Sequence, residues 1–420
     1  MPRKQIEEVI LSEALLLQLK YAHTNSPFYR QKLGKGFTVA SLKTTGDFAE
    51  LPFTTKDDIA KDNWSFLAVD RNEVLDFAST SGTLGKAVAN FLTESDLQRL
   101  AINEKGSFQI GGCSNTDTIQ LTTTMDKQFM AGLAYHYGAR ALGASFIRTG
   151  PGVLAMQWKN ILDFKPTVLI AVPSFVPMLI KYAQSNGISI NDCSVQKIIC
   201  IGEPVWNKEM KLGAIAKQIK EQWNVELIST YACTEMATAF TACSEFSGVH
   251  SQQHLIYTEV VNEKGQQVKN GEIGEVVVTP LGVQGMPLIR FKTGDLCQYF
   301  EDKCNCNREG LRLGPVLGRQ QQMLKIKGTT LFPNMVFDVL NGIKAVKSFY
   351  LEIDTDDLAN DTLRIFCHCS EKEQVEIKQR LQAGLRVSPE VVFVDRDFIY
   401  NKRFANQSRK PILIKDLRKK

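Results

Sequence analysis

The chain has 420 residues, of which 44% are hydrophobic and 23% charged, and its formal net charge is +5. This composition excludes a disordered or fibrous chain, and the length exceeds what one hydrophobic core usually serves, so we expect at least two domains. No apolar run approaches the roughly 20 residues of a membrane helix. Residues 1–23 predict an amphipathic helix and not a secretion signal, because Glu7, Glu8 and Glu13 interrupt the apolar stretch. We therefore expect a cytoplasmic protein whose ten cysteines are mostly reduced.

Basic residues concentrate in the last quarter of the chain. Residues 319–420 contain 19 Lys and Arg against 13 Asp and Glu, and the stretch 402–420 has eight basic residues against the single Asp416. The total excess is too small to indicate a nucleic-acid binder. This tail is either a solvated face or a surface that meets a polyanion, for which nucleotide phosphates qualify.

Helices and strands alternate through the first three quarters of the chain. Thr93 followed by Asp96 is a capping-box pattern and predicts a helix over 94–110. Further along, the pattern predicts a strand over 167–172, a helix that ends before Gly187, a strand over 195–201, a helix over 207–224 and a strand over 225–230. This alternation favours βαβ units around a largely parallel sheet, in which ligands bind beyond the carboxyl ends of the strands.

From about residue 255 the pattern changes to β-structure, with turn signals at Gly265 and Gly271. After Gly318 a smaller unit follows, with strands predicted in 347–354, 362–369 and 390–395 and a helix in 371–384. We expect an α/β fold class: a large N-terminal domain over 1–318, with several subdomains, mostly parallel sheets flanked by helices and a β-rich segment, then a small α+β domain over 319–420.

Several loops carry small and polar residues where a strand is predicted to end. The stretch "STSGTLGK" (79–86) has the glycines, hydroxyls and lysine of a phosphate cradle, but it is not the P-loop pattern, and a plain surface turn fits the composition equally well. The other loops are "IGEP" (201–204), "STYACTEM" (229–236), "RFKTGDL" (290–296) and "GRQQQMLKIKG" (318–328).

In this order, these loops resemble the motifs of the adenylate-forming acyl-CoA ligase superfamily, and in particular the phenylacetate–CoA ligases and the related coenzyme F390 synthetases. The resemblance runs nearly end to end. It includes "NSPFYRQKL" (25–33), "LPFTTKDDI" (51–59), "YHYGARALGASFI" (135–147), "PLIRFKTGDL" (287–296) and "SRKPILIKDLR" (408–418).

The resemblance implies an ATP site. The phosphate loop would contact the β- and γ-phosphates through Ser81, Gly82, Thr83, Gly85 and Lys86, although Leu84 and Ala87 stand where relatives usually carry Thr and Pro. The other nucleotide-binding positions implied are Gly202, Glu203 and Pro204 at the adenine edge, Tyr231 stacked on adenine, Thr234 beside it, Asp295 on the ribose hydroxyls, and Arg319 near ribose and phosphate. Glu235 would hold Mg²⁺. The structural alternatives are a core tyrosine for Tyr231, a helix-start acid for Glu235 and a turn-capping aspartate for Asp295. For Gly202, Glu203 and Pro204 the alternative is an ordinary structural turn.

The resemblance also implies a catalytic lysine and a mobile C-terminal domain. Lys410 matches the lysine that contacts the carboxylate substrate and the α-phosphate while acyl-adenylate forms, with Arg409 where glycine is usual. In the superfamily this domain rotates between the two half-reactions. The pivot falls after Arg319, where relatives often have an acid and this chain has Gln320–Gln322.

A second metal site is suggested by three cysteines and one histidine. Cys243 and His250 follow the Tyr231 motif, and Cys304 and Cys306 follow Asp295. A Cys₃His set with no open position is typical of structural Zn²⁺, and similar residues occur in part of this family. Two alternatives remain: that the four are unrelated, or that Cys297 is one of the ligands.

The resemblance places the acid pocket along residues 122–144, with Tyr135, His136 and Gly138 as pocket residues, and implies an aryl or arylalkyl acid such as phenylacetate. The lead-in Thr122–Met125 is more polar than in relatives, which leaves a hydroxylated or non-aromatic acid open. The partners expected are this acid, ATP, Mg²⁺ and coenzyme A, with no nucleic acid and no membrane, and a homodimer is left open. The alternative functions are acyl transfer to a carrier protein or other acceptor, and non-catalytic nucleic-acid binding.

Overall fold

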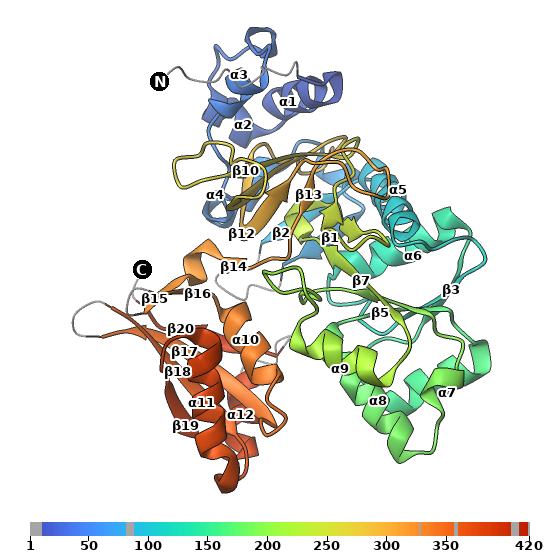
Figure 1. Cartoon of the computed structure of the whole chain (residues 1–420). Coiled ribbons are helices and arrows are strands. Elements are labelled where there is room, and N and C mark those ends of the chain that lie inside the picture. Colours follow the sequence, from blue (N-terminus) through green and yellow to red (C-terminus); the bar gives the residue numbers. More distant parts are fainter. Residues whose placement is uncertain (1–10, 81–87, 327–328, 357–359, 405–410, 419–420) are drawn as a thin grey trace.

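The computed structural model of the chain describes residues 11–80, 88–326, 329–356, 360–404 and 411–418. Its main feature is a twelve-stranded sheet with a parallel half and an antiparallel half (Figure 1). A separate four-stranded sheet with its own helices is formed by residues near the C-terminus. The α/β fold class predicted from the sequence is confirmed. Among the helices in these ranges, none has the length and apolar content to cross a bilayer.

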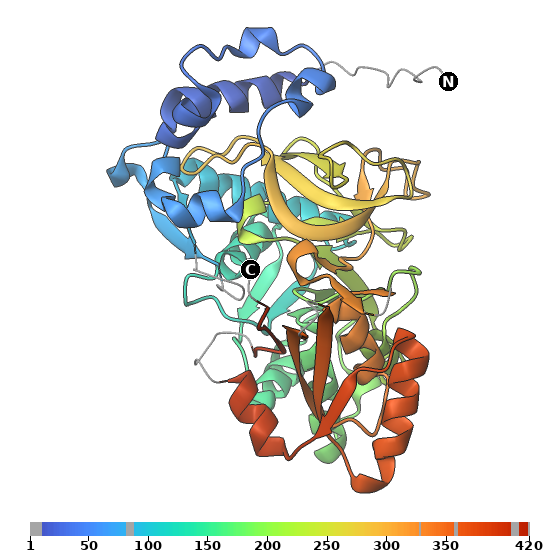
Figure 2. The ribbon, with the colours of Figure 1, turned by 90° about the vertical axis from the view of Figure 1, so that its left-hand side faces the viewer.

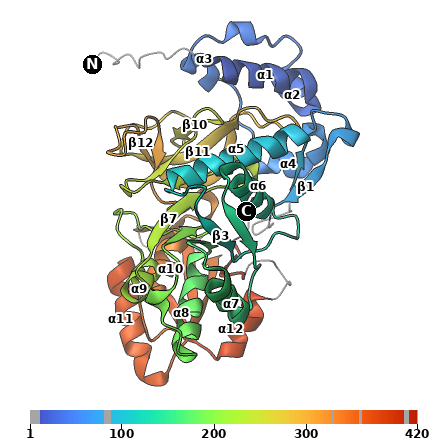
Figure 3. The same ribbon diagram turned by 90° about the vertical axis from the view of Figure 1, so that its right-hand side faces the viewer.

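The parallel half is covered by helices on both faces. Its strands, in spatial order, are β4 (Ser145–Arg148), β3 (Thr118–Leu121), β5 (Val168–Ala171), β6 (Lys197–Cys200) and β7 (Glu226–Tyr231). One face packs on α5 (Glu94–Ile110) and α6 (Met130–Leu142), which lie side by side (Figure 3), and the other on α7 (Leu154–Phe164), α8 (Val176–Ser185) and α9 (Ala214–Gln222). Alternate residues of β5 serve the two cores: Val168 and Ile170 face one, Leu169 and Ala171 the other. Because both faces of β5 are buried, its sequence is a continuous apolar run.

The antiparallel half continues from β7. Its strands, in spatial order, are β8 (Phe240–Ala242), β9 (Val249–His250), β13 (Arg312–Leu313), β12 (Phe291–Phe300), β11 (Ile273–Pro280) and β10 (Ile256–Val261), and β14 (Gly318–Arg319) also pairs with β12. The expected turns at Gly265 and Gly271 are present, with φ of 76° and 85°. A separate hairpin joins β1 (Asp76–Ser79) to β2 (Ala89–Leu92).

The N-terminal helices cover this antiparallel half (Figure 2). They are α1 (Glu13–Asn25), α2 (Pro27–Leu33), α3 (Thr45–Ala49) and α4 (Lys56–Lys61). Helix α1 begins after Ser12, whose side chain accepts a hydrogen bond from the Leu15 amide. Residues 1–10 of the helix predicted over 1–23 lie outside the described residues.

Arg290, at the start of β12, fixes this N-terminal segment to the sheet. Its guanidinium forms a two-point ion pair with Glu259 of β10, at 3.0 and 2.9 Å, and donates to the carbonyls of Ala49 and Leu51. It also stacks on the ring of Phe53, 4.1 Å from the centroid. Arg290 is only 1% exposed, so these hydrogen bonds compensate the guanidinium for the hydration lost on burial.

The C-terminal unit has a hydrophobic core of its own. Its elements are β15 (Leu324–Ile326), β16 (Thr329–Leu331), α10 (Pro333–Asn341), β17 (Ser348–Thr355), β18 (Asp361–His368), α11 (Gln374–Leu385), β19 (Glu390–Phe393), α12 (Arg396–Arg403) and β20 (Ile414–Asp416). Helix α10 lies against α9 (Figure 1), where Asp338 accepts a hydrogen bond from the Ala214 amide at 2.7 Å.

The helix predicted over 207–224 is shorter than expected, because α9 begins only at Ala214. The Asn207 amide donates to the Lys211 carbonyl and Met210 has a positive φ of 57°, so this stretch turns before the helix starts. Gly213, the residue before the helix, has no side chain with which to cap it, and Asp338 supplies the acceptor instead.

We expect Arg290→Met to lower the free energy of unfolding by about 3–5 kcal/mol, because Glu259 would keep a buried charge without its partner. Urea unfolding of the two proteins measures the difference. Arg364→Met is the control, since Arg364 and Glu390 form an exposed pair, and such pairs contribute about 0–1 kcal/mol. Equal losses in the two variants would contradict this prediction.

Candidate active site at the carboxyl edge of the sheet

The carboxyl ends of β5, β6 and β7 meet at one edge because these strands are parallel. After β6 the chain turns through Gly202, whose φ of 74° favours glycine. The Glu203 carboxylate then accepts hydrogen bonds from the amide and hydroxyl of Ser174, at 2.8 and 2.7 Å. Gly202, Glu203 and Pro204 thus form a loop that is tied to the neighbouring strand end at this edge.

Tyr231, Asp295 and Arg319, predicted separately, form one cluster, here called the Asp295 cluster. The Tyr231 hydroxyl donates to Asp295 Oδ2 at 3.0 Å, and Arg319 Nε donates to Oδ1 at 3.3 Å. The three residues come from β7, β12 and β14. Asp295 and Arg319 are also direct partners in the β12–β14 register. The cluster joins the two halves of the large sheet.

Burial sets the electrostatics of this cluster. It raises the pKa of Asp295 above its ordinary value, although the Arg319 charge and the Tyr231 hydroxyl act in the opposite direction. It also raises the pKa of Tyr231 well above 10, with the Asp295 charge adding to the effect. The phenol therefore stays protonated and can only donate to the carboxylate, which fixes the orientation of its ring.

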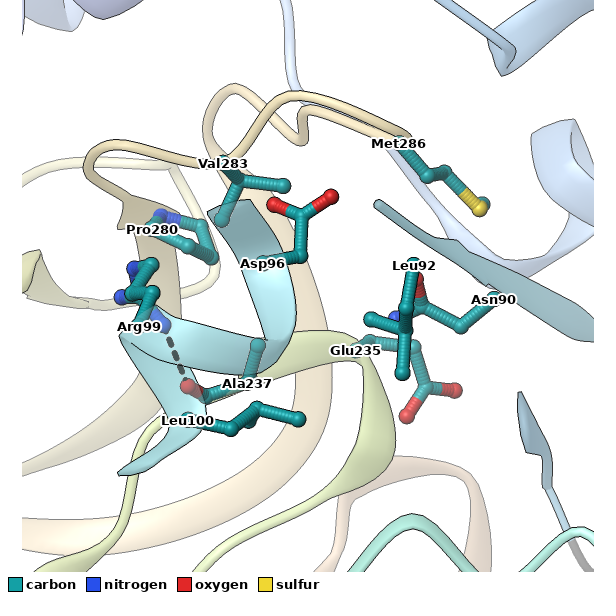
Figure 4. Close-up of a pocket in the computed structure, with 10 residues that line it drawn as sticks. All are labelled: Asn90, Leu92, Asp96, Arg99, Leu100, Glu235, Ala237, Pro280, Val283 and Met286. Atoms are coloured by element: carbon teal, nitrogen blue, oxygen red, sulfur yellow. Dashed lines mark hydrogen bonds between the residues drawn. The ribbon is translucent and has the colours of Figure 1, made fainter. Parts of the chain in front are cut away.

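Glu235 lies close to this cluster and is paired with a lysine from the N-terminal segment. The carboxylate is 8% exposed, and Lys56 Nζ lies 3.3 Å from its Oε1. Asn90 Nδ2 holds the preceding loop by donating to the Thr234 carbonyl at 3.2 Å. In Figure 4 the carboxylate of Glu235 points away from that of Asp96. The adjoining cavity is only about 10 Å³, which accommodates at most one water, so it is not the substrate site.

Lys56 is a functional candidate that the sequence alone does not single out, although it lies in the motif "LPFTTKDDI". Thr54 is attached to β12 by two backbone hydrogen bonds, to Arg290 and Lys292, and its hydroxyl donates to the Ile289 carbonyl at 2.7 Å. Lys56 then opens α4, where a positive charge faces the positive end of the helix dipole. The pairing with Glu235 offsets this unfavourable position.

The predicted phosphate-loop residues Ser81, Gly82, Thr83, Gly85 and Lys86 lie outside the described residues, as does Lys410. The chain on either side of the loop is held together: the Thr80 amide donates to the Val88 carbonyl at 3.0 Å, and the Val88 amide donates to Thr80 Oγ1 at 3.1 Å.

The three predicted acid-pocket residues are all on α6. Tyr135 and Gly138 are buried, and the Tyr135 ring packs near Phe108 of α5. The His136 ring lies against Phe146 of β4, with centroids 5.5 Å apart, so it projects toward the sheet edge. Tyr135 and His136 therefore face different neighbours.

The four predicted zinc ligands come together. The ligand atoms of Cys243, His250, Cys304 and Cys306 all lie within 4.8 Å of one another. His250 Nε2 is 3.3 Å from Cys243 Sγ and 3.4 Å from Cys306 Sγ. Burial lowers the pKa of His250 to about 4, so the imidazole is neutral at pH 7. Cys297, considered as a substitute, is instead fully buried in the apolar core.

We expect Lys56→Met to lower the free energy of unfolding by about 1 kcal/mol, because Glu235 would be left without its counter-charge. Urea unfolding at pH 7 measures this. Lys159→Met, which removes an exposed pair with Asp163, should change stability by less than about 0.5 kcal/mol. A Lys56 variant as stable as the wild type would show that the pair contributes nothing.

Comparison with known proteins identifies the family. The family model of AMP-binding enzymes matches residues 27–284. The phenylacetate–coenzyme A ligase of Thermus thermophilus is 30% identical over 402 residues, covering 94% of this chain and 87% of that protein. The ligase of the same name from Pseudomonas putida is 28% identical over 345 residues, covering 80% and 76%. A crystal structure of a 2-hydroxyisobutyryl-CoA ligase with 2-HIB-AMP has the same fold, with a TM-score of 0.82, 22% identity and coverage of 99% and 94%. The chain belongs to the AMP-binding enzyme family and, within it, is related to the phenylacetate–coenzyme A ligases.

Proposed function

We propose that this chain joins a carboxylic acid to coenzyme A in two steps, through an acyl-adenylate, with release of pyrophosphate and then AMP. The observation that carries this proposal is the Asp295 cluster beside the Lys56–Glu235 pair, at the carboxyl edge of a parallel sheet in an AMP-binding enzyme. Two family motifs separated by 64 residues meet here through a single hydrogen bond.

In this proposal the Asp295 cluster binds the nucleoside. The carboxylate of Asp295 accepts hydrogen bonds from the ribose hydroxyls, for which its paired oxygens are suited. Tyr231, whose hydroxyl is held by Asp295, presents its ring face to adenine, while Gly202, Glu203 and Pro204 border the base and Thr234 lies next to it. Arg319 stays near the ribose and the α-phosphate.

Glu235 fits a magnesium ligand. It is a buried carboxylate whose present partner, Lys56, is a flexible side chain that is 42% exposed and so can move aside. Mg²⁺ favours carboxylate and phosphate oxygens, and it would neutralise charge on the ATP phosphates when an anionic carboxylate approaches. Lys56 would then be free to face the phosphates, together with Lys86.

The second step needs the C-terminal unit to move. In this proposal Lys410 serves the adenylation step by offsetting the charge of two approaching anions, and the unit then rotates to admit coenzyme A. The Asp338–Ala214 contact joins the two parts of the chain and would have to break during that rotation. The boundary proposed between them lies at residues 318 and 319.

For the substrate we propose an aryl or arylalkyl acid, such as phenylacetate, held along α6 by Tyr135, His136 and Gly138. The names of the relatives support this class. The same first step would also serve an enzyme that loads a carrier protein, so detection of a coenzyme A thioester distinguishes the two acceptors. An oligonucleotide that leaves pyrophosphate release unchanged would count against nucleic-acid binding.

Pyrophosphate release across a panel of carboxylic acids tests the first step. Glu235→Gln and Asp295→Asn should each reduce it about thirtyfold or more, because each removes a charged contact to ATP worth about 2–5 kcal/mol. The exposed Glu263→Gln is the control and should retain full activity. Normal pyrophosphate release in the Glu235 and Asp295 variants would contradict the proposal that these residues bind Mg²⁺ and the ribose of ATP.

We also propose that Cys243, His250, Cys304 and Cys306 hold one structural Zn²⁺. The donor set fits: three sulfurs and a neutral imidazole can complete a closed tetrahedral site. The residues come from β9, the turn after β8 and the segment between β12 and β13, so the ion would cross-link three parts of the antiparallel half.

Metal analysis of protein purified without chelator should show about one zinc per chain, because a closed four-ligand site of this kind retains its ion. Cys304→Ser together with Cys306→Ser should remove it and lower the melting temperature. The matched control is Cys193→Ser with Cys369→Ser, two half-buried cysteines outside the cluster. Metal-free wild-type protein, or unchanged stability after the ligands are replaced, would show that these four residues are ordinary core residues and not zinc ligands.

A further inference from the structure

Glu104, on the face of α5 that meets α6, has a buried oxygen that nothing in the described chain satisfies. The residue is 5% exposed. Its Oε1 accepts a hydrogen bond from Asn103 Nδ2 at 3.0 Å, whereas its Oε2 is buried and has no partner among the described residues. A buried polar atom without a partner is costly and rare in folded proteins. A hydrogen-bond donor on a bound ligand would satisfy this oxygen.

The position of Glu104 connects it to the acid-pocket residues. A Cβ at Gly138 would lie 2.2 Å from the Cβ of Glu104, so α5 and α6 touch here and only glycine fits. Tyr135 is one helical turn before Gly138 on the same helix, and its hydroxyl has no hydrogen bond to any residue that the structure describes. The Glu104 charge acts on this phenol and, after burial, is the next cause of its raised pKa.

Two other buried polar atoms in the stretch 122–144 also lack partners. Thr123 Oγ1, in the loop that follows β3, and His136 Nδ1, on α6, are buried and make no hydrogen bond within the described ranges. These atoms belong to the stretch that carries the acid pocket in the proposed function. A pocket for an unsubstituted phenyl ring would be lined by apolar groups, which need no hydrogen-bond partners.

We propose that Glu104 determines substrate specificity: its free oxygen and the Tyr135 hydroxyl form a hydrogen-bonding floor of the acid pocket that selects an acid carrying a hydroxyl group. This inference rests on the proposed function, because it requires the acid to lie along α6. A hydroxyl group can donate to one floor atom and accept from the other. It would satisfy both at once.

The charge state of the floor favours a neutral substituent. Burial raises the pKa of Glu104 to about 8, and the Asn103 amide opposes this only in part. At pH 7 the carboxyl group is then mostly protonated and neutral. A second carboxylate or an ammonium group on the substrate would bring an unpaired charge into a buried site, which is strongly unfavourable.

The test compares phenylacetate with its 2-, 3- and 4-hydroxy derivatives, and benzoate with the hydroxybenzoates, by kcat/KM for pyrophosphate release. Sites built to bind a substrate hydroxyl discriminate strongly against the analogue that lacks it. We expect the wild type to prefer at least one hydroxylated acid over its parent by tenfold or more. Glu104→Leu should reduce this ratio at least tenfold by gaining activity toward the parent acid, whereas Glu104→Gln should keep most of the preference.

Tyr135→Phe removes only the phenol oxygen and should also lower the ratio, which keeps the proposal testable if the Glu104→Leu protein does not fold. Glu94→Leu, at the exposed start of α5, is the control and should leave the ratio unchanged. Wild-type activity without preference for a hydroxylated acid, or equal losses on both acids in the variants, would overturn the specificity role and leave the proposed function standing. No pyrophosphate release with any acid would overturn both.

Discussion

The geometry of the candidate site depends on one buried cation, Arg290. Its guanidinium joins the N-terminal segment to Glu259 of β10, and its backbone leads directly into β12. This attachment positions two pairs of residues in the candidate site. Thr54 is aligned on β12, which brings Lys56 to Glu235, and β12 itself carries Asp295 to Tyr231. A single desolvated arginine thus holds the N-terminal segment against residues more than 200 positions away in the chain.

In the proposed function the site has a fixed part, and the C-terminal unit would supply the rest. The fixed part contains the Asp295 cluster and Glu235, both on strands or turns that neighbouring strands hold on each side. Such support suits groups that must be positioned before the substrate arrives. The Cys–His residues lie on the same antiparallel half, so the proposed zinc cross-link and the strands proposed to contact the nucleotide would share one sheet.

Much of this arrangement could be predicted from sequence, and the exceptions have physical reasons. Alternating apolar residues and the Thr93 capping box revealed the strands and α5, because those signals are local. The predicted start of α9, at residue 207, was wrong. The helix begins at Ala214, and its capping group, Asp338, is 124 positions away in the sequence. Lys56 and Glu104 were missed for the same reason: their significance depends on a distant partner, or on the lack of one, and only a folded chain shows either.

The cap that Asp338 provides to α9 depends on the position of the C-terminal unit, to which Asp338 belongs. Ser12 and Thr93, by contrast, directly precede the helices that they cap. Gly213 leaves the room for it, since a Cβ there would come 3.0 Å from Asp338 Oδ1. If the C-terminal unit swings away, the Ala214 amide loses its acceptor and the first turn of α9 can fray into water. Hydrogen–deuterium exchange at the Ala214 amide would then report movement of the C-terminal unit, and the measurement would need no labelled substrate.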